Sequence, residues 1–266
     1  MKRVPLFLPS VFLILPVSAA LAQEQLASPH RAQHAPDGGT LEMISSIFIP
    51  TMPNAPFTAT VNTEWIRPLP DGSTITLKNH RTIARDAAGR VFQERRMLVP
   101  EDDKDEPALR QIEISDPVAH EFYVCKTQER VCRLQPFSRP ESAGFAAPGS
   151  GRGQAGSAGT EDLGKQSIGG LETVGSRETT VIPTGTMGNN SPLLSKREFW
   201  YSPLLGINLI TKRQDPRGGD QNFEVSDIAV GEPDSKLFQV PAGFKVLDMR
   251  KVPEVSSSQS QTASPN

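Results

Sequence analysis

The feature of this sequence that most restricts its fold is an alternation of apolar and polar residues, broken by turn residues about every ten positions. The odd-numbered residues from Phe57 to Trp65, for example, would share one face of a strand. The other stretches of this kind are 74–84, 89–99, 171–182, 196–202, 206–213 and 221–230. Because 24 prolines and 21 glycines in 266 residues also disfavour long helices, we predict a mainly β, antiparallel fold with few short helices.

The first three stretches form a meander whose register can be predicted. A two-residue turn at Ala87-Ala88 would place Arg81 opposite Glu94, and apolar residues would then meet apolar residues along the same two strands. In this register, one face of the sheet is apolar and is lined by Phe57, Val61, Trp65, Ile75, Leu77, Ile83, Phe92 and Leu98. A polar stripe on the same face consists of Asn79, Arg81, Glu94 and Arg96.

Each of these two sets has a functional and a structural interpretation. The apolar face would bind an apolar ligand, or it would be the ordinary core of the domain. The polar stripe would bind an anionic headgroup or a carboxylate at the mouth of an apolar groove, because guanidinium groups recognise such anions well. Alternatively, it is a structural ion pair that neighbouring side chains half cover. The residues alone leave both alternatives open.

The two cysteines, Cys125 and Cys132, are spaced for a hairpin. If residues 127–130 form a four-residue loop, Cys125 lies directly opposite Cys132, where Cα atoms approach to about 4.5 Å. We therefore predict a disulfide, which would form in an oxidising compartment. A redox or metal-binding dithiol is the weaker interpretation, because C-x6-C is neither the C-x2-C redox spacing nor part of a ligand cluster.

The N-terminus has the pattern of a secretory signal peptide. Lys2 and Arg3 precede an apolar stretch, and small residues place the expected cleavage between Ala22 and Gln23. Three prolines in the stretch argue against a membrane anchor. No later stretch is apolar enough for a transmembrane span, so we expect a protein that is periplasmic or secreted.

Composition divides the rest of the chain. Residues 23–40 and 251–266 are polar and aperiodic, and we expect a flexible N-terminal segment and a disordered tail there. Between them we expect a single β-sheet domain at 41–250, interrupted by a disordered Gly/Ala/Ser-rich loop at 138–160.

Three motifs in the second half of the chain resemble those of a known protein family. Residues 162–175 contain G-x-x-x-I-x-G, residues 198–212 contain Trp200 followed by Ser-Pro-Leu-Leu-Gly, and residues 237–244 contain F-x-x-P-x-G-F. They resemble periplasmic lipoprotein-carrier-like (LolA-like) and lipoprotein-sorting-protein-like domains. This resemblance implies a strongly curved, half-barrel-like antiparallel sheet whose concave face receives an acyl chain or another apolar ligand under helices. The chain departs from the pattern because a helical cover is hard to find. Its meander also resembles uncharacterised secreted proteins of soil bacteria.

Common catalytic and metal-binding motifs are not found in the sequence. There is no G-x-S-x-G, P-loop, S-x-x-K or H-E-x-x-H motif. Gly151–Gly156 matches G-x-G-x-x-G but lies inside the predicted loop, so we attribute the match to chance. Glu101–Glu106 is an acidic run that we interpret as a solvated loop partly neutralising the basic segment 78–96. A formal net charge of −2 offers no basic field for nucleic acid.

These observations predict a non-catalytic envelope protein without cofactor or metal. Its expected function is to bind an apolar or lipid-like ligand on the apolar face. The alternative is a protein-interaction or sensor domain of the envelope that uses sheet edges and the loop at 138–160. A hydrolase without a recognisable motif is the least favoured class.

Overall fold

The computed structural model describes residues 46–137 and 157–251. The predicted signal peptide at 1–22, the flexible segment at 23–40 and all but the first residue of the predicted tail lie outside these ranges. Most of the predicted loop at 138–160 also lies outside them, but its last four residues belong to a strand. Within the described ranges, no helix is long and apolar enough to cross a membrane.

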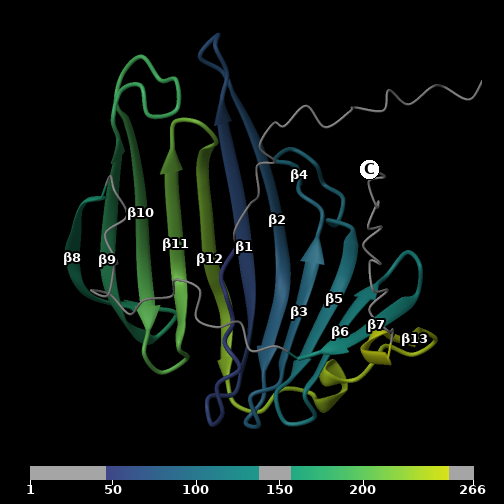
Figure 1. Cartoon of the computed structure of the whole chain (residues 1–266). Coiled ribbons are helices and arrows are strands. Elements are labelled where there is room, and N and C mark those ends of the chain that lie inside the picture. The colour runs from purple at the N-terminus through teal and green to yellow at the C-terminus, as the bar shows by residue number, and fades with distance from the viewer. Residues whose placement is uncertain (1–45, 138–156, 252–266) are drawn as a thin grey trace, which may run out of the picture. The chain divides into compact units, whose positions relative to one another are not determined.

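The described residues form one mainly antiparallel sheet (Figure 1), which confirms the predicted fold class. The strands run in the order β13-β7-β6-β5-β3-β2-β1-β12-β11-β10-β9-β8, with β4 paired to β2. The elements are β1 (Phe57–Pro68), β2 (Thr74–Arg85), β3 (Val91–Arg96), β4 (Val99–Pro100), β5 (Leu109–Asp116), β6 (Glu121–Lys126), β7 (Val131–Pro136), β8 (Ser157–Ile168), β9 (Leu171–Ile182), β10 (Leu193–Ser202), β11 (Ile207–Asp215), β12 (Gly219–Val230), η1 (Ser235–Phe238), β13 (Lys245–Asp248) and η2 (Met249–Lys251).

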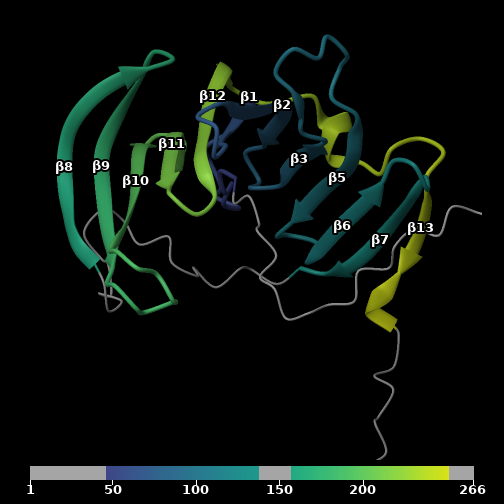
Figure 2. The same cartoon turned by 90° about the horizontal axis from the view of Figure 1, so that it is seen from above.

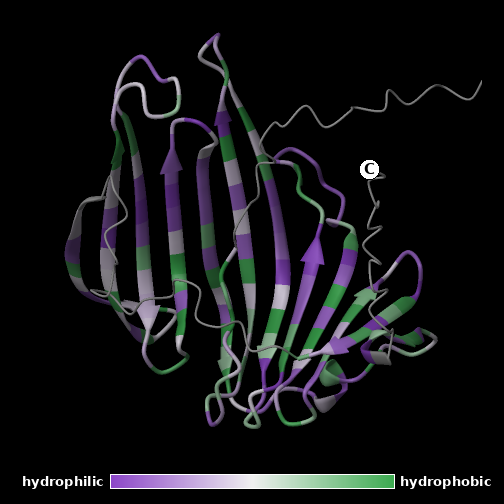
Figure 3. Cartoon of the chain, in the orientation of Figure 1, coloured by the Kyte–Doolittle hydropathy of each residue, from purple (hydrophilic) through white to green (hydrophobic). Residues whose placement is uncertain are grey.

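The sheet is strongly curved (Figure 2), as the resemblance implied, with β8 and β13 at its two edges. Bands of hydrophobic and hydrophilic residues alternate along its strands (Figure 3), which is the pattern that predicted them. The odd-numbered residues of β1 and β2 share a face, because Phe57 pairs with Arg85 and Trp65 pairs with Leu77. This face is the concave one, and the chain before β1 lies against it.

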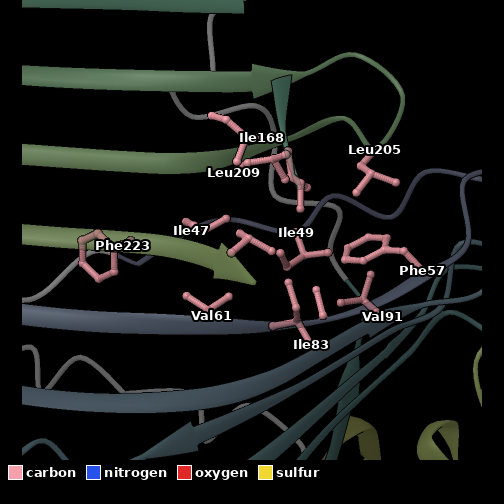
Figure 4. Close-up of a cluster of buried hydrophobic side chains, with 13 residues drawn as sticks. Ile47, Ile49, Phe57, Val61, Ile83, Val91, Ile168, Leu205, Leu209 and Phe223 are labelled. Atoms are coloured by element: carbon pink, nitrogen blue, oxygen red, sulfur yellow. The ribbon is translucent and has the colours of Figure 1, made fainter. Parts of the chain in front are cut away.

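A hydrophobic core occupies one end of the concave face, which we call the Phe57 end (Figure 4). Phe57, Val61 and Ile83 are fully buried there. Residues 46–50, which form no strand and which we call the covering segment, insert Ile47 and Ile49 between these side chains and those of β11. Side chains of the chain itself therefore fill this end of the concavity, in the place where the resemblance implied a helical cover.

The predicted register between β2 and β3 is wrong by one residue. Ile83 pairs with Gln93, and Ala84 pairs with Phe92. The loop has three residues instead of two, because Gly89 adopts a positive φ of 85° and its N–H donates to the carbonyl of Asp86. Since a shift of one residue moves every side chain of β3 to the other face, Phe92 lies on the convex face and not on the predicted apolar face.

A second hydrophobic cluster covers part of the convex face. Phe92 packs there with Ala84, Ile114 and Phe238, and the last of these belongs to η1. The side chain of Asp234 caps η1 by accepting a hydrogen bond from the Lys236 N–H. The short helix thus buries the aromatic ring that the predicted register had assigned to the ligand face.

The β6–β7 hairpin confirms the predicted disulfide. Cys125 pairs directly with Cys132 across the two strands, their Cα atoms are 3.8 Å apart, and the two sulfurs are bonded. Residues 127–130 form the turn, and both cysteines are fully buried. This bond therefore ties the hairpin inside the protein and not at its surface.

Candidate functional site

The predicted apolar face separates into two regions. Phe57, Val61 and Ile83 belong to the closed core at the Phe57 end. Trp65 and Leu77, at the other end of β1 and β2, are half-buried, and Ile75 is 42% exposed. We call this second region the Trp65 end. Two predicted residues remain. Leu98 is half-buried between β3 and β4, and Leu77 pairs with Pro100 instead of with Leu98. Phe92 lies on the convex face.

The predicted polar stripe is divided between the two faces by the same shift of register. Asn79 and Arg81 lie on the concave face, whereas Glu94 and Arg96 lie on the convex face, where they form an ion pair of 2.9 Å. Arg81 therefore does not pair with Glu94. Glu106 of the acidic run accepts from Arg96 at 2.7 Å, so this loop does partly neutralise the basic segment.

Arg81 is a buried cation on the concave face. Its guanidinium donates to Gln93 Oε1, Ser46 Oγ and the carbonyl of Ile47 at 3.0–3.2 Å. Burial, and then the charge of Arg95, lower the pKa of Arg81 to about 9. At neutral pH it remains charged, and among the described residues no carboxylate lies within ion-pair distance of it.

Arg85, which the sequence did not single out, holds the Phe57 end together. It is completely buried, and it donates to the carbonyls of Ala55, Pro50 and Leu205 at 2.6–3.0 Å. Its guanidinium also lies 5.1 Å from the ring centroid of Phe57. Arg81 and Arg85 together bind carbonyls of the covering segment, so side chains and not a β ladder fix this segment to the sheet.

At the Trp65 end, strand pairing places five residues in one row across the concave face, which we call the Trp65 row. It consists of Arg197, Arg213, Gln221, Trp65 and Leu77, each directly opposite the next on the neighbouring strand. The Trp65 indole N–H donates to the carbonyl of Gly218 at 2.7 Å, and Arg67 lies over its ring. The row therefore joins a fixed aromatic surface to two cations.

The sequence pattern did not reveal the Trp65 row because its members come from separated segments. Trp65 and Leu77 were predicted, but Arg197, Arg213 and Gln221 were not. Their positions in alternating stretches gave a signal for each strand, but the order of β12, β11 and β10 beside β1 was needed to bring them together.

A groove of about 480 Å³ lies on the convex side, between β12, β1, β2 and the acidic loop. Its lining is mostly charged and polar and includes Glu64, Lys78, His80 and Glu106. His80 Nε2 and Glu106 Oε1 are 2.9 Å apart, so the loop is attached to the floor of the groove. This lining suits water better than an acyl chain. Among the described residues, no group of three or more His, Cys, Asp or Glu residues could hold a metal ion.

Neither a protein-family model nor a curated protein matches the sequence. Among solved structures, the chain is similar to a chain of the Pseudomonas aeruginosa MucA/MucB complex, at 15% identity and a TM-score of 0.40, over 74% of this chain and 59% of that one. It thus spans about three fifths of that chain. It is also similar to an uncharacterized conserved protein from Thermus thermophilus, at 10% identity and a TM-score of 0.38, over 73% of this chain and 90% of that one.

A third similar structure is a LolA superfamily protein from Nitrosomonas europaea, at 12% identity and a TM-score of 0.29, over 71% of this chain and 91% of that one. It belongs to the superfamily that the sequence motifs resemble. Because these identities and TM-scores are low, the similarities concern the fold alone, and they say nothing about which ligand or partner this chain binds.

Proposed function

We propose that this chain is a non-catalytic, exported binding module that holds an apolar or lipid-like ligand against the Trp65 end of the concave face. The observation that carries the proposal is the contrast in burial along β1 and β2. Phe57, Val61 and Ile83 are fully buried by their own neighbours, whereas Trp65 and Leu77 lie opposite each other and stay partly exposed. Apolar side chains on a concave surface, beside a closed core, suit an apolar ligand.

The covering segment supports the same function. Ile47 and Ile49 occupy the concave face as an extended apolar chain would, and the carbonyls of this segment accept hydrogen bonds from Arg81 and Arg85. Because no ladder of backbone hydrogen bonds joins it to a described strand, we infer that the segment can move when a longer ligand enters from the Trp65 end.

The alternative, a partner protein bound at a sheet edge, has less support. The edge strand β8 has two register shifts against β9, and it exposes Glu161, Asp162 and Lys165. Bulges and charges are the devices by which edge strands avoid pairing with other chains. The opposite edge strand, β13, has only four residues.

The test is displacement of a fluorescent fatty acid from the purified mature protein. We expect saturable binding that is lost in Trp65→Glu and in Leu77→Glu, because either carboxylate would be buried against the acyl chain. Ile66→Glu is the matched control, since Ile66 follows Trp65 on β1 and faces the convex side. Binding equally reduced in all three variants, or no saturable binding by the wild type, would contradict the proposal.

Native mass spectrometry of protein purified from the periplasm gives a second measurement. A co-purified lipid of defined mass that is missing from Trp65→Glu would support the binding module. A co-purified protein retained equally by Trp65→Glu would instead support the interaction domain.

A further inference from the structure

Two arginines on neighbouring strands face each other on the concave side, and neither forms an ion pair within the described ranges. Arg197 of β10 lies directly opposite Arg213 of β11, and adjacent strands are about 4.8 Å apart. Within the described ranges, neither guanidinium forms a hydrogen bond or an ion pair. Like charges directly opposite each other in a sheet are destabilising. Burial, and then the charge of Arg197, lower the pKa of Arg213, and the charge of Asp215 acts in the opposite direction.

The neighbouring carboxylates form no ion pair with these two arginines. Glu178 lies opposite Arg197 on β9; both side chains are exposed, and they form no ion pair. Asp215 is occupied by Arg217, whose guanidinium donates to both of its oxygens. The Trp65 end therefore has an excess of positive charge on its concave side.

Gln221 provides an independent sign of a ligand at the same place. It is directly opposite Arg213 and only 4% exposed, yet its Oε1 is buried without a hydrogen-bond partner. A buried acceptor left unpaired is uncommon in proteins and needs a donor. Neither Arg197 nor Arg213 donates to Gln221 Oε1 in this structure, so we take the missing donor to come with the group that binds the two arginines.

The geometry points to a subsite for a phosphate headgroup that carries a hydroxyl or ammonium donor, and we propose that Arg197 and Arg213 bind its phosphate while Gln221 Oε1 accepts from the donor. The two non-bridging oxygens of a phosphodiester can each accept from one guanidinium, so one phosphate can bridge the pair while its two ester substituents carry the donor and the acyl chains. The distance from Arg197 to Gln221 is two strand spacings, or about 10 Å, which a phosphoglycerol group and the arginine side chains can span.

The order of the Trp65 row fits a lipid that carries this headgroup. Beyond Gln221 the row continues with Trp65 and Leu77, which are the apolar residues of the proposed ligand surface. The inference thus rests on the proposed function for its acyl chain, and it adds the chemical class of the headgroup: an anionic phospholipid such as phosphatidylglycerol.

The test compares three probes by calorimetry: dihexanoyl phosphatidylglycerol, dihexanoyl phosphatidylcholine and glycerol 3-phosphate. The choline headgroup has a phosphate but no donor, and glycerol 3-phosphate has the headgroup without chains. We expect the wild type to bind phosphatidylglycerol about tenfold more tightly than phosphatidylcholine. Arg213→Gln and Arg197→Gln should each reduce the affinity for phosphatidylglycerol about tenfold. Gln221→Leu should reduce the preference between the two lipids.

Lys212→Gln is the matched control, because Lys212 precedes Arg213 on β11 and faces the convex side. A loss in this control equal to that in Arg213→Gln would overturn the subsite, since a general effect of net charge would explain both. If both lipids bind equally and Trp65→Glu abolishes them, the proposed function stands and the headgroup subsite fails.

If only glycerol 3-phosphate binds, and this binding depends on Arg213, the phosphate subsite stands. Its source is then a free phosphate ester, and the lipid function fails. Folding of each variant is checked by circular dichroism, so that a loss of binding is assigned only to a folded protein.

Discussion

The two faces of β9, β10 and β11 differ in whether their arginines form ion pairs. On the convex face, Arg177 bridges Glu161 and Glu198 at 2.9 and 2.8 Å. On the concave face, Arg197 precedes Glu198 in sequence and Arg213 follows Lys212. Neither of these arginines forms an ion pair within the described ranges. The same strands thus supply ion-pair partners to Arg177 on one face and leave Arg197 and Arg213 without an ion pair to a described residue on the other. This difference is what the proposed headgroup subsite on the concave face would require.

The buried arginines of β2 extend this contrast. Arg81 and Arg85 donate to carbonyls, a hydroxyl and an amide, and neither forms an ion pair with a described residue, although the charges of Glu113 and Glu94 act on Arg81. The convex face has ion pairs and is covered by η1, and on the concave face Arg95 pairs with Glu113. Substitutions on the two faces should therefore have different consequences.

The largest effect is expected for Arg85→Met. This change leaves the carbonyls of Ala55, Pro50 and Leu205 buried without donors, and it should reduce the free energy of unfolding by about 3–5 kcal/mol. Arg177→Met, on the exposed convex network, should have a far smaller effect. Urea denaturation followed by tryptophan fluorescence measures both. Similar losses in the two variants would remove the distinction between the faces.

A somewhat smaller effect is expected for Phe92→Ala, at about 3 kcal/mol, because its ring is buried in the cluster under η1. A double-mutant cycle tests which face holds the ring. Phe92→Ala and Phe238→Ala should show a coupling free energy of about 1 kcal/mol. Phe92→Ala and Ile83→Val, on opposite faces, should be additive within about 0.5 kcal/mol. Strong coupling between Phe92 and Ile83 would mean that the two side chains share a face, as the predicted register requires.

Removal of the disulfide by Cys125→Ala with Cys132→Ala should destabilise the protein by about 2.5 kcal/mol, because the loop that the bond closes is short. Thermal unfolding of the variant, and of the wild type with and without reductant, measures this loss. Ligand binding at the Trp65 end should be unchanged under conditions where the variant is folded, since β6 and β7 supply no residue of the Trp65 row. A selective loss of binding would connect the two regions.

The smallest effect concerns the acid dependence of the convex ion pairs. Burial acts to raise the pKa of Glu198, but the hydrogen bond from the Trp200 indole and the Arg177 guanidinium together lower it below 4.5. Because the folded state favours the carboxylate, its contribution to stability is present above about pH 4.5 and is lost as the pH falls through the lowered pKa. Glu198→Gln should flatten this dependence by less than about 1 kcal/mol. Urea midpoints measured between about pH 3 and pH 6 test this expectation. If Glu198→Gln leaves the slope of stability against pH unchanged, Glu198 is not the source of the acid dependence.

The strands of this fold could be predicted where alternation was regular. The stretch 171–182 coincides with β9, and 74–84 differs from β2 by one residue. The disulfide followed from one local hairpin. The β2–β3 register did not, because Ala87-Ala88 suggests a two-residue turn as readily as the three-residue loop that the positive φ of Gly89 produces. One additional loop residue moved Phe92, Glu94 and Arg96 to the convex face.

The candidate site was less predictable because its parts are distant in sequence. Trp65 was found as an aromatic residue on an apolar face, but its neighbours Gln221 and Arg213 lie far along the chain, on β12 and β11. The start of β8 was interpreted as a loop because its first residues are small and glycine-rich, and only pairing with β9 makes them a strand. Long-range pairing, which no local pattern encodes, therefore determined the outcome at both places.

The strand order has a consequence for how the molecule assembles. β1 pairs with β12 and β7 pairs with β13, so residues 57–68 and 131–136 each lack one neighbour until residues 219–230 and 245–248 have been synthesised. During synthesis from the N-terminus, the early hairpins therefore keep open flanks for most of translation. Such distant partners make for slow folding, and a truncation that removed β13 would leave β7 as a newly exposed template for aggregation.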